Sequence, residues 1–290
     1  MTIPLIHGLS SLAGRYDGLL VDLWGCLHDG VEAHACAVDA LVAFRRLGGR
    51  VVLLSNAPRT PQAIARQLEA MGVPDCAWDG IMTAGLATRL AVEERENSWY
   101  AALGPRFWHL GTERDACLLD GLARERCTDV DDADFVLCCG IRRPGETLDD
   151  IMPELEPALA RGLPMLSANP DRFVLRGVVR EICAGMIAEA YVARGGSMRQ
   201  EGKPFPSVYR RCLGMLADAL PERVLAVGDG IGTDIVGARD SGIDAVWITG
   251  GLPAHFWGIA PERVPPQTLV DEACRRHDVR PAGIMPMLTW

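Results

Sequence analysis

Three continuous apolar stretches stand out in the hydrophobic pattern of this chain. Each is rich in Val and Leu and finishes in small polar or acidic residues, which predicts strands that are covered on both faces. Because ligands bind at the carboxyl ends of parallel strands, we expect these polar ends to meet at one site. The stretches are "GLLVD" ending in Asp22, "RVVLLSN" ending in Ser55 and Asn56, and "RVLAVGDG" with Asp229.

Helical patterns separate these predicted strands. Apolar residues recur at helical spacing, and one segment carries a Pro in its first turn. Strand–helix alternation predicts an α/β fold, a Rossmann-like doubly wound parallel sheet with right-handed crossovers. The helical segments are "AVDALVAFRRLGG", "TPQAIARQLEAMGV" and "PFPSVYRRCLGMLADAL".

The middle of the chain repeats this alternation on a smaller scale. We interpret residues 84–196 as an inserted α/β cap domain, which leaves a discontinuous core domain of residues 1–83 and 197–290. Beyond Pro261 the sequence predicts one helix, "QTLVDEACRRHD", and no clear chemistry. The inserted strands are "RFWHLG", "DFVLCCGI" and "LPMLSANPD", and the helices are "TLDDIMPELEPALARG" and "EICAGMIAEAYVARGG".

Composition narrows the classes of partner and compartment. The 290 residues are 49% hydrophobic and carry a net charge of -9, which disfavours nucleic acid and anionic membranes as partners. The amino-terminal segment lacks a basic region followed by a long apolar core, and no window reaches the length of a membrane helix. Ten scattered cysteines without a CxxC pair favour reduced thiols. We therefore expect a soluble, cytoplasmic protein.

The polar residues at the predicted strand ends suit phosphoryl transfer when they are taken together. Singly, an Asp at a strand end more often caps a helix, and Lys203 in "EGKPFP" would ordinarily be a solvated surface residue. A carboxylate approaches a phosphate dianion only if the repulsion is cancelled by a hard cation and a fixed positive side chain. Asp22 and Asp229 would hold Mg²⁺, and Lys203 would offset the remaining charge.

In this interpretation the Ser55 hydroxyl and backbone N–H groups at the start of the next helix donate hydrogen bonds to the phosphate oxygens. Asp22 then attacks phosphorus and forms an aspartyl-phosphate. A dinucleotide-binding reading of the glycines in "GDGIGTD" is disfavoured, because an Asp inside that loop repels a pyrophosphate.

The ordered motifs resemble those of the haloacid dehalogenase superfamily of hydrolases. They are "DLWGCL" with Asp22, "LLSNAPR" with Ser55, "GKP" with Lys203, and "GDGIGTD" with Asp229 and Asp234. The large insertion and the "NPD" of residues 169–171 resemble the class IIA branch, which includes nucleotide, phosphoglycolate and pyridoxal phosphatases.

That resemblance implies a Rossmann-like core with an α/β cap and Mg²⁺ held by Asp22, the backbone carbonyl of Trp24, and Asp229. It also implies that Asp234 supports the metal and the lysine, and that cap residues choose the substrate. The candidates on the cap side are Asn169 and Asp171. A homo-oligomer assembled through the cap is among the arrangements that the resemblance allows.

Trp24 departs from the family pattern, which places a second Asp there as general acid and base. An indole does neither task, and general acid–base catalysis contributes about 10²–10⁴-fold in rate. Three readings stay open. The first is a phosphatase in which His28 or Asp29 moves protons, or whose leaving group needs little protonation. The second is other chemistry at Asp22, such as dehalogenation, although the acidic pair of Asp229 and Asp234 speaks against it.

The third reading is a pseudo-phosphatase that binds a phosphorylated ligand without efficient turnover. The reading that we favour is a Mg²⁺-dependent hydrolase of a small phosphorylated metabolite, whose identity the sequence does not give. Other candidates stay closer to ordinary structural roles: Cys26 in packing, Arg142 and Arg143 in a solvated loop, and Arg172 as a weak cap-side candidate.

Overall fold

The computed structural model describes residues 3–176, 179–217 and 219–290, which form two compact units. The first unit contains the chain up to Ser55, together with Gln62–Met82 and Lys203–Trp290, and the second contains Asn56–Pro61 and Thr83–Gly202. We describe each unit by itself. The domain boundaries expected from the sequence, 1–83 with 197–290 and 84–196, stay a prediction beside these units.

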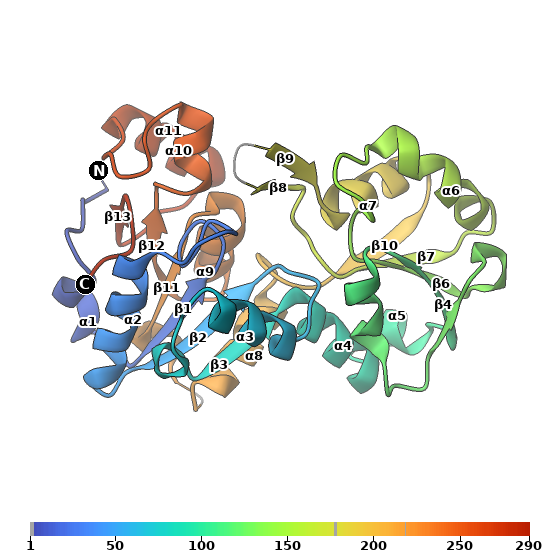
Figure 1. Ribbon diagram of the computed structural model, residues 1–290, viewed down its shortest axis with the longest axis horizontal. Helices are drawn as coiled ribbons and strands as arrows, with labels where there is room; N and C mark the ends of the chain where they lie inside the picture. Colours follow the sequence, from blue (N-terminus) through green and yellow to red (C-terminus); the bar gives the residue numbers. More distant parts are fainter. Residues whose placement is uncertain (1–2, 177–178, 218) are drawn as a thin grey trace. The chain divides into compact units, whose positions relative to one another are not determined.

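A six-stranded parallel sheet forms the centre of the first unit (Figure 1). Its order is β13-β12-β11-β1-β2-β3, so each of the three predicted strands with a polar end is confirmed. The apolar runs are buried along β1 and β11, as expected for strands that are covered on both faces. The bounds are β1 Gly18–Asp22, β2 Arg50–Ser55, β3 Gly80–Thr83, β11 Val224–Gly228, β12 Asp244–Ile248 and β13 Gly283–Met285.

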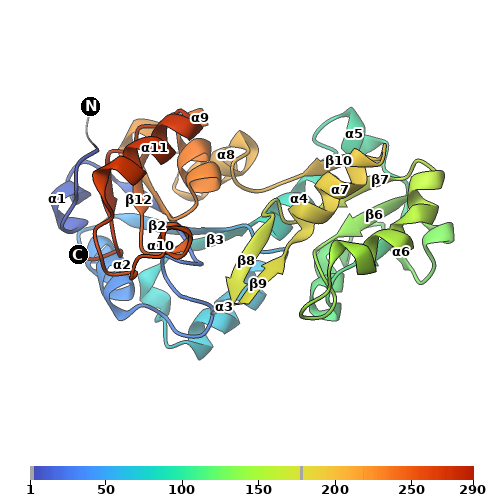
Figure 2. The same cartoon turned by 90° about the horizontal axis from the view of Figure 1, so that it is seen from above.

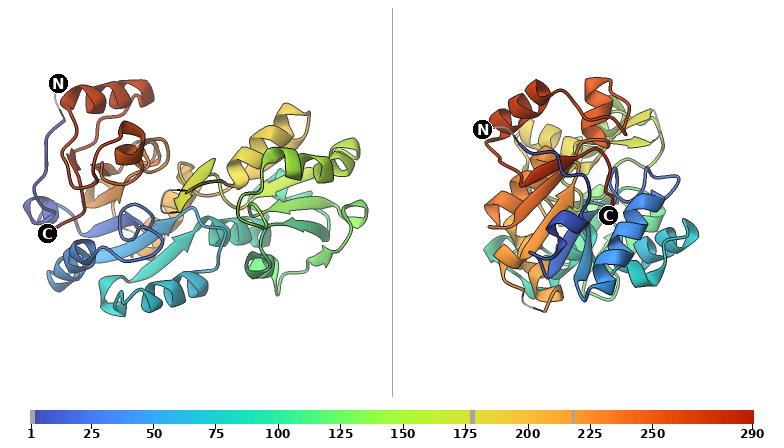
Figure 3. Two further views of the ribbon diagram at one scale, coloured as in Figure 1. Left: turned by 45° about the horizontal axis from the view of Figure 1, so that its top comes forward. Right: turned by 90° about the vertical axis from the view of Figure 1, so that its left-hand side faces the viewer.

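Helices cover both faces of this sheet because the chain winds in two directions (Figure 3). It runs from β1 through β2 to β3 on one side and from β11 through β12 to β13 on the other. The helices are α1 Ser10–Ala13, α2 Ala35–Arg46, α3 Pro61–Ala70, α8 Pro206–Met215, α9 Val236–Asp240, α10 Leu252–Trp257 and α11 Gln267–His277. Short turns are η1 Asp75–Ala77, η4 Pro221–Arg223 and the π-helical η5 Ile231–Ile235.

The three helices predicted for this unit and the one in its tail are present. The predicted third helix extended to Leu220, whereas α8 ends at Met215 and Asp218 lies outside the described residues. Ala217 has φ 58°, a left-handed conformation that does not continue a helix. The tail also supplies β13, which the sequence did not predict.

The winding direction reverses at β1, which pairs with both β2 and β11. Asp22 pairs in register with Leu54, so Ser55 lies one residue further along β2. Val21 pairs with Val227, so Asp229 follows closely on the other side. Reversal points of this kind form the ligand crevices of open α/β sheets.

The second unit contains a five-stranded parallel sheet with the order β10-β7-β6-β4-β5 (Figure 2). The three strands predicted in the insertion are confirmed as β4, β6 and β7. A separate antiparallel pair, β8 and β9, was not predicted. The bounds are β4 Arg106–Leu110, β5 Glu125–Cys127, β6 Phe135–Cys138, β7 Pro164–Ser167, β8 Phe173–Arg176, β9 Val179–Ile182 and β10 Ser197–Gln200.

Two apolar layers enclose this second sheet. One face packs on α6 Leu148–Ala160 and α7 Ala184–Ala193, and the other packs on α4 Ala84–Glu94, α5 Ser98–Ala101 and η2 Glu113–Leu119 (Figure 1). A further short turn is η3 Val130–Asp132. The prediction that a helix starts at Glu181 is wrong, because Glu181 and Ile182 pair with β8 and α7 begins only at Ala184.

All ten cysteines are free thiols, in agreement with the sequence analysis. Within the described ranges, no helix combines the length and the apolar character that crossing a membrane requires.

Leu155 tests how strongly the second unit depends on its α6 layer. Its side chain is fully buried among α7 and β6 residues, so Leu155→Ala leaves a cavity and is expected to lower the free energy of unfolding by about 2–5 kcal/mol. The neighbouring exposed Glu156→Ala should change it by less than about 0.5 kcal/mol. Denaturant unfolding measures both, and equal effects would contradict this packing.

Candidate active site

A buried lysine joins two acidic side chains at the carboxyl ends of the first sheet. Lys203 Nζ donates to Asp22 Oδ1 over 2.6 Å and to Asp234 Oδ1 over 2.8 Å. The three residues are only 3%, 6% and 4% exposed, respectively. Asp22 ends β1 and Asp234 lies in η5, so one ammonium group fixes two elements that are far apart in sequence.

Asp229 lies next to this trio, directly after β11, and the backbone holds it tightly. Its Oδ2 accepts the Leu252 N–H over 2.6 Å, and its carbonyl accepts the indole N–H of Trp247 over 2.8 Å. A Cβ at either Gly25 or Gly251 would overlap this carboxylate, and Gly25 also has φ +79°. Both positions therefore require glycine for the acidic group to be enclosed.

Asp234 lies in the π turn, which is the π-helical element η5, and hydrogen bonds to both its side chain and its backbone orient it. Asp234 Oδ2 accepts the Gly230 N–H over 3.1 Å. The Tyr209 hydroxyl on α8 is within 3.1 Å of the Thr233 carbonyl and 3.2 Å of the Asp234 carbonyl. Turns of this type are frequent at functional sites.

Three buried carboxyls share the positive charge of Lys203, and their acidity reflects this imbalance. Burial, and then repulsion from Asp22 and Asp234, holds the pKa of Asp229 well above its usual range. Burial raises the pKa of Asp234 too, although Lys203 opposes the shift. When all three carboxyls are ionised, the cluster carries more negative charge than its own lysine neutralises.

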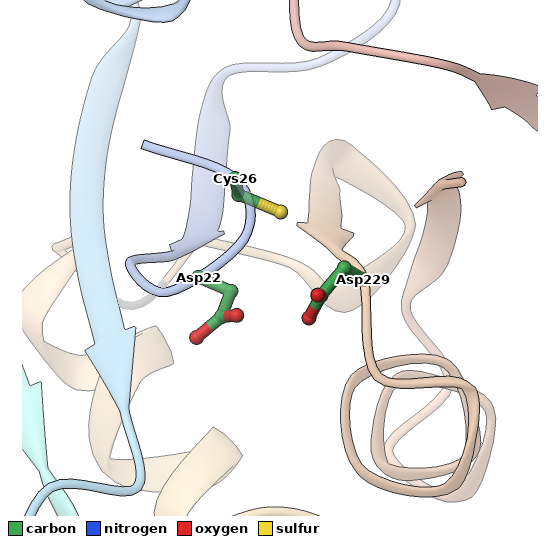
Figure 4. A group of neighbouring side chains, drawn as sticks. All are labelled: Asp22, Cys26 and Asp229. Atoms are coloured by element: carbon green, nitrogen blue, oxygen red, sulfur yellow. The ribbon is translucent and has the colours of Figure 1, made fainter. Parts of the chain in front are cut away.

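The donor set at this point fits a divalent cation. Ligand atoms of Asp22, Asp229 and Cys26 all lie within 4.8 Å of one another (Figure 4). Carboxylate oxygens are the donors that Mg²⁺ prefers, and the excess negative charge favours a cation. Burial, followed by the charges of Asp229 and Asp22, raises the pKa of the Cys26 thiol well above its usual value.

Four of the sequence-predicted site residues, Asp22, Lys203, Asp229 and Asp234, are thus brought together. Ser55 ends the neighbouring strand β2 and is buried. The roles expected for these residues stay predictions.

The other predicted substrate contacts lie together in the second unit. Asn56 Nδ2 donates to Asp171 Oδ1 over 2.8 Å, and the Asp171 N–H donates to Asn169 Oδ1 over 2.9 Å. These bonds tie the segment after β2 to the segment after β7. Their role in substrate binding stays a prediction.

The loop after Asp22 is packed by its own aromatic and acidic side chains. The half-buried Trp24 ring lies against Gly30, where a Cβ would overlap the indole, and 5.3 Å from the His28 ring. His28 Nδ1 accepts the Gly30 N–H over 3.0 Å. Asp29 accepts two backbone N–H groups of the following turn, which lower its pKa. The Asp29 carboxylate thus orders the turn, and the expectation that Asp29 or His28 moves protons stays a prediction.

The arginines considered in the sequence form ion pairs inside the second unit. Arg142 pairs with Glu146 and Glu154, and Arg172 pairs with Glu189. Sequence reasoning missed Tyr209 and Trp247, which look like ordinary core aromatics. The Gly250–Gly251 pair after β12 is the sequence signal that the backbone passes close to another group here, and the sequence analysis did not consider it.

The chain is similar to known hydrolase families and to a solved structure. Residues 19–122 match the family described as haloacid dehalogenase-like hydrolase, and residues 200–272 match a family described as HAD-hydrolase-like. A crystal structure of a haloacid dehalogenase-like hydrolase from Brucella suis is 31% identical, with a TM-score of 0.83, over 98% of this chain and 100% of that one.

Two characterised relatives are similar over most of the chain. The D-glycerol 3-phosphate phosphatase of Mycobacterium tuberculosis is 24% identical over 97% of this chain and 77% of its own. The ribonucleotide monophosphatase NagD of Escherichia coli K12 is 27% identical over 81% of this chain and 88% of its own.

The raised pKa of Asp229 predicts a characteristic pH dependence in metal-free protein. A carboxyl with a raised folded-state pKa binds its proton more tightly when folded, so its contribution to stability falls as pH rises from about 4 through that raised pKa. Asp229→Asn, which keeps the shape without the charge, should lose this dependence and gain up to about 1.4 kcal/mol per pH unit over the wild type.

Thermal unfolding in EDTA between pH 4 and 8 measures this difference. Adding Mg²⁺ at pH 8 should stabilise the wild type and leave Asp229→Asn unchanged. Parallel pH profiles for the two proteins would contradict the electrostatic imbalance.

Proposed function

Because this chain belongs to the haloacid dehalogenase-like hydrolases, we propose that it is a Mg²⁺-dependent phosphatase of a small phosphorylated metabolite. The observation that carries the proposal is the buried Lys203 between Asp22 and Asp234, with the Asp229 carboxyl beside them. Two relatives named as phosphatases, one for D-glycerol 3-phosphate and one for ribonucleotides, support the substrate class.

In the proposed reaction Asp22 is the nucleophile. A carboxylate oxygen of Asp22 forms a bond to phosphorus while the bond to the leaving oxygen breaks, and that oxygen takes up a proton as it departs. Water then hydrolyses the aspartyl-phosphate, which releases phosphate and restores the carboxylate. Lys203 offsets the charge of the phosphoryl oxygens, and Asp234 holds Lys203 in position.

Asp22, Asp229 and the backbone carbonyl of Trp24 would hold the cation. Bound Mg²⁺ supplies the positive charge that allows an anionic carboxylate to approach a phosphate dianion. The Ser55 hydroxyl would donate a hydrogen bond to a phosphoryl oxygen. Asn56, Asn169 and Asp171 are proposed to contact the rest of the substrate, with residues 84–196 acting as the cap.

Trp24 favours a second candidate function, a binding protein with little turnover. In our proposal Trp24 stands where the family has an acid–base Asp, and an indole neither protonates a leaving oxygen nor activates water. The retained cluster of Asp22, Lys203 and Asp229 supports the enzyme over the binder, since binding alone does not call for a nucleophile. If the protein is an enzyme, leaving groups of low pKa should be the better substrates.

Asp22→Asn tests the nucleophile. We expect it to lower Mg²⁺-dependent phosphate release at least about 10³-fold, in the range found for loss of a catalytic nucleophile. The panel comprises glycerol phosphate, nucleoside monophosphates and p-nitrophenyl phosphate. Asp17→Asn, an exposed carboxylate just before β1, serves as the control and should retain activity. Ligand-dependent thermal stabilisation without turnover of any compound would favour the binding protein.

Trp24→Asp tests the missing acid and base. Restoring a carboxyl should raise kcat for alkyl phosphates by about 10²–10⁴-fold over Trp24→Asn, while p-nitrophenyl phosphate gains much less. The Asn variant is the matched control because it removes the same indole packing from Gly30 without adding an acid. Equal activity of the Asp and Asn variants, both above the wild type, would show that the indole only obstructs the site.

A further inference from the structure

Cys26 brings a soft donor to a site that otherwise offers oxygen. It follows Gly25 in the turn after β1 and is only 2% exposed. Figure 4 shows its sulfur pointing into the space that the Asp22 and Asp229 carboxylates also face. Throughout the described ranges, these residues are the one group of three His, Cys, Asp or Glu side chains whose ligand atoms lie within 4.8 Å of one another.

This position is unusual for a thiol that serves only in packing. Buried cysteines behave as small apolar groups and normally face apolar neighbours, whereas this sulfur faces two acidic side chains. Within the described part of the chain the thiol forms no hydrogen bond to protein. Thiolate sulfur selects softer ions such as zinc, whereas carboxylates alone suit magnesium.

The spacing suits one thiophilic ion. Zinc binds thiolate sulfur at about 2.3 Å and carboxylate oxygen at about 2.0–2.2 Å, so two donors that share the ion lie at most about 4.5 Å apart. The 4.8 Å bound on the donor separations exceeds this by only a few tenths of an ångström, which small side-chain rotations close. Mg²⁺ takes oxygen donors and gains nothing from the sulfur.

We propose that Asp22, Cys26 and Asp229 form a binding site for a thiophilic divalent cation, Zn²⁺ or Cd²⁺, which competes there with Mg²⁺. Binding forms a metal–sulfur bond, and the thiol proton leaves to solvent. Lys203 donates to Asp22 Oδ1 and the Leu252 N–H donates to Asp229 Oδ2, so both carboxylates are held in place beside the thiol.

The consequence for turnover rests on the proposed function. A cation held by the Cys26 thiolate displaces Mg²⁺ from Asp22 and Asp229, so Zn²⁺ should inhibit a Mg²⁺-dependent phosphatase. Cys26 is thereby the residue that sets the metal preference of this site.

The experiment follows Cd²⁺ binding without substrate. EDTA-stripped protein is titrated with Cd²⁺, and the ultraviolet charge-transfer absorption of the cadmium–thiolate bond is recorded. Cys26→Ser should lose this absorption and bind Cd²⁺ at least about tenfold more weakly, since even the loss of an outer partner of a ligand costs that much. Added Mg²⁺ should displace the ion from wild type.

Two further variants keep the result interpretable. Cys274→Ser removes another buried thiol of the same unit, on α11, and should leave the signal intact, while the exposed cysteines give the same background in every variant. Cys26→Ala replaces the serine variant if that protein does not fold. Asp229→Asn should weaken both Cd²⁺ and Mg²⁺ binding.

Unchanged Cd²⁺ affinity and absorption in Cys26→Ser would overturn the proposal, even if the protein proves to be a phosphatase. Cys26-dependent absorption in a protein without Asp22-dependent turnover would support the metal site and reject the proposed function. In an active enzyme, Zn²⁺ inhibition should weaken at least about tenfold in Cys26→Ser.

Discussion

The positions of the site residues in the first unit depend on the salt bridges from Lys203 to Asp22 and Asp234. A buried ammonium is strongly unfavourable unless it is paired, and here two carboxylates pair it. The first ends β1 and the second lies in the π turn after β11, so the pairing fixes the reversal point of the sheet. The Tyr209 hydroxyl and the Gly230 N–H fix that turn in its place.

The same arrangement leaves a charge imbalance that the fold does not resolve by itself. Asp229 is enclosed by the backbone of Gly25 and Gly251, with burial and like charges raising its pKa. Folding therefore stores electrostatic repulsion at one point, and a bound cation relieves it. A site built this way gains affinity for a cation, because its carboxylates are already desolvated and oriented before any ligand arrives. The cost is a lower free energy of unfolding for the ligand-free protein.

The loop between Asp22 and Gly30 carries the two side chains on which our proposals about proton chemistry and metal preference rest. Trp24 packs on Gly30 and beside His28, and Cys26 turns its sulfur toward the carboxylates. Family membership accounts for the strands and for the acidic and basic residues at their ends. In our proposals, an indole and a thiol within five residues of the nucleophile change the proton chemistry and the metal preference without disturbing that scaffold.

The sequence by itself determined the α/β class, the strands that end at Asp22, Ser55 and Asp229, and most long helices, because these follow from local periodicity and end signals. It did not reveal β8 and β9, which exist through pairing with each other, or the start of α7 after them. It also read Cys26 as packing and Lys203 as a solvated residue when taken singly. Only the tertiary structure decided that the thiol and the lysine face buried carboxylates, because residues as far apart in the sequence as Cys26 and Asp229 meet there and no local pattern encodes such a contact.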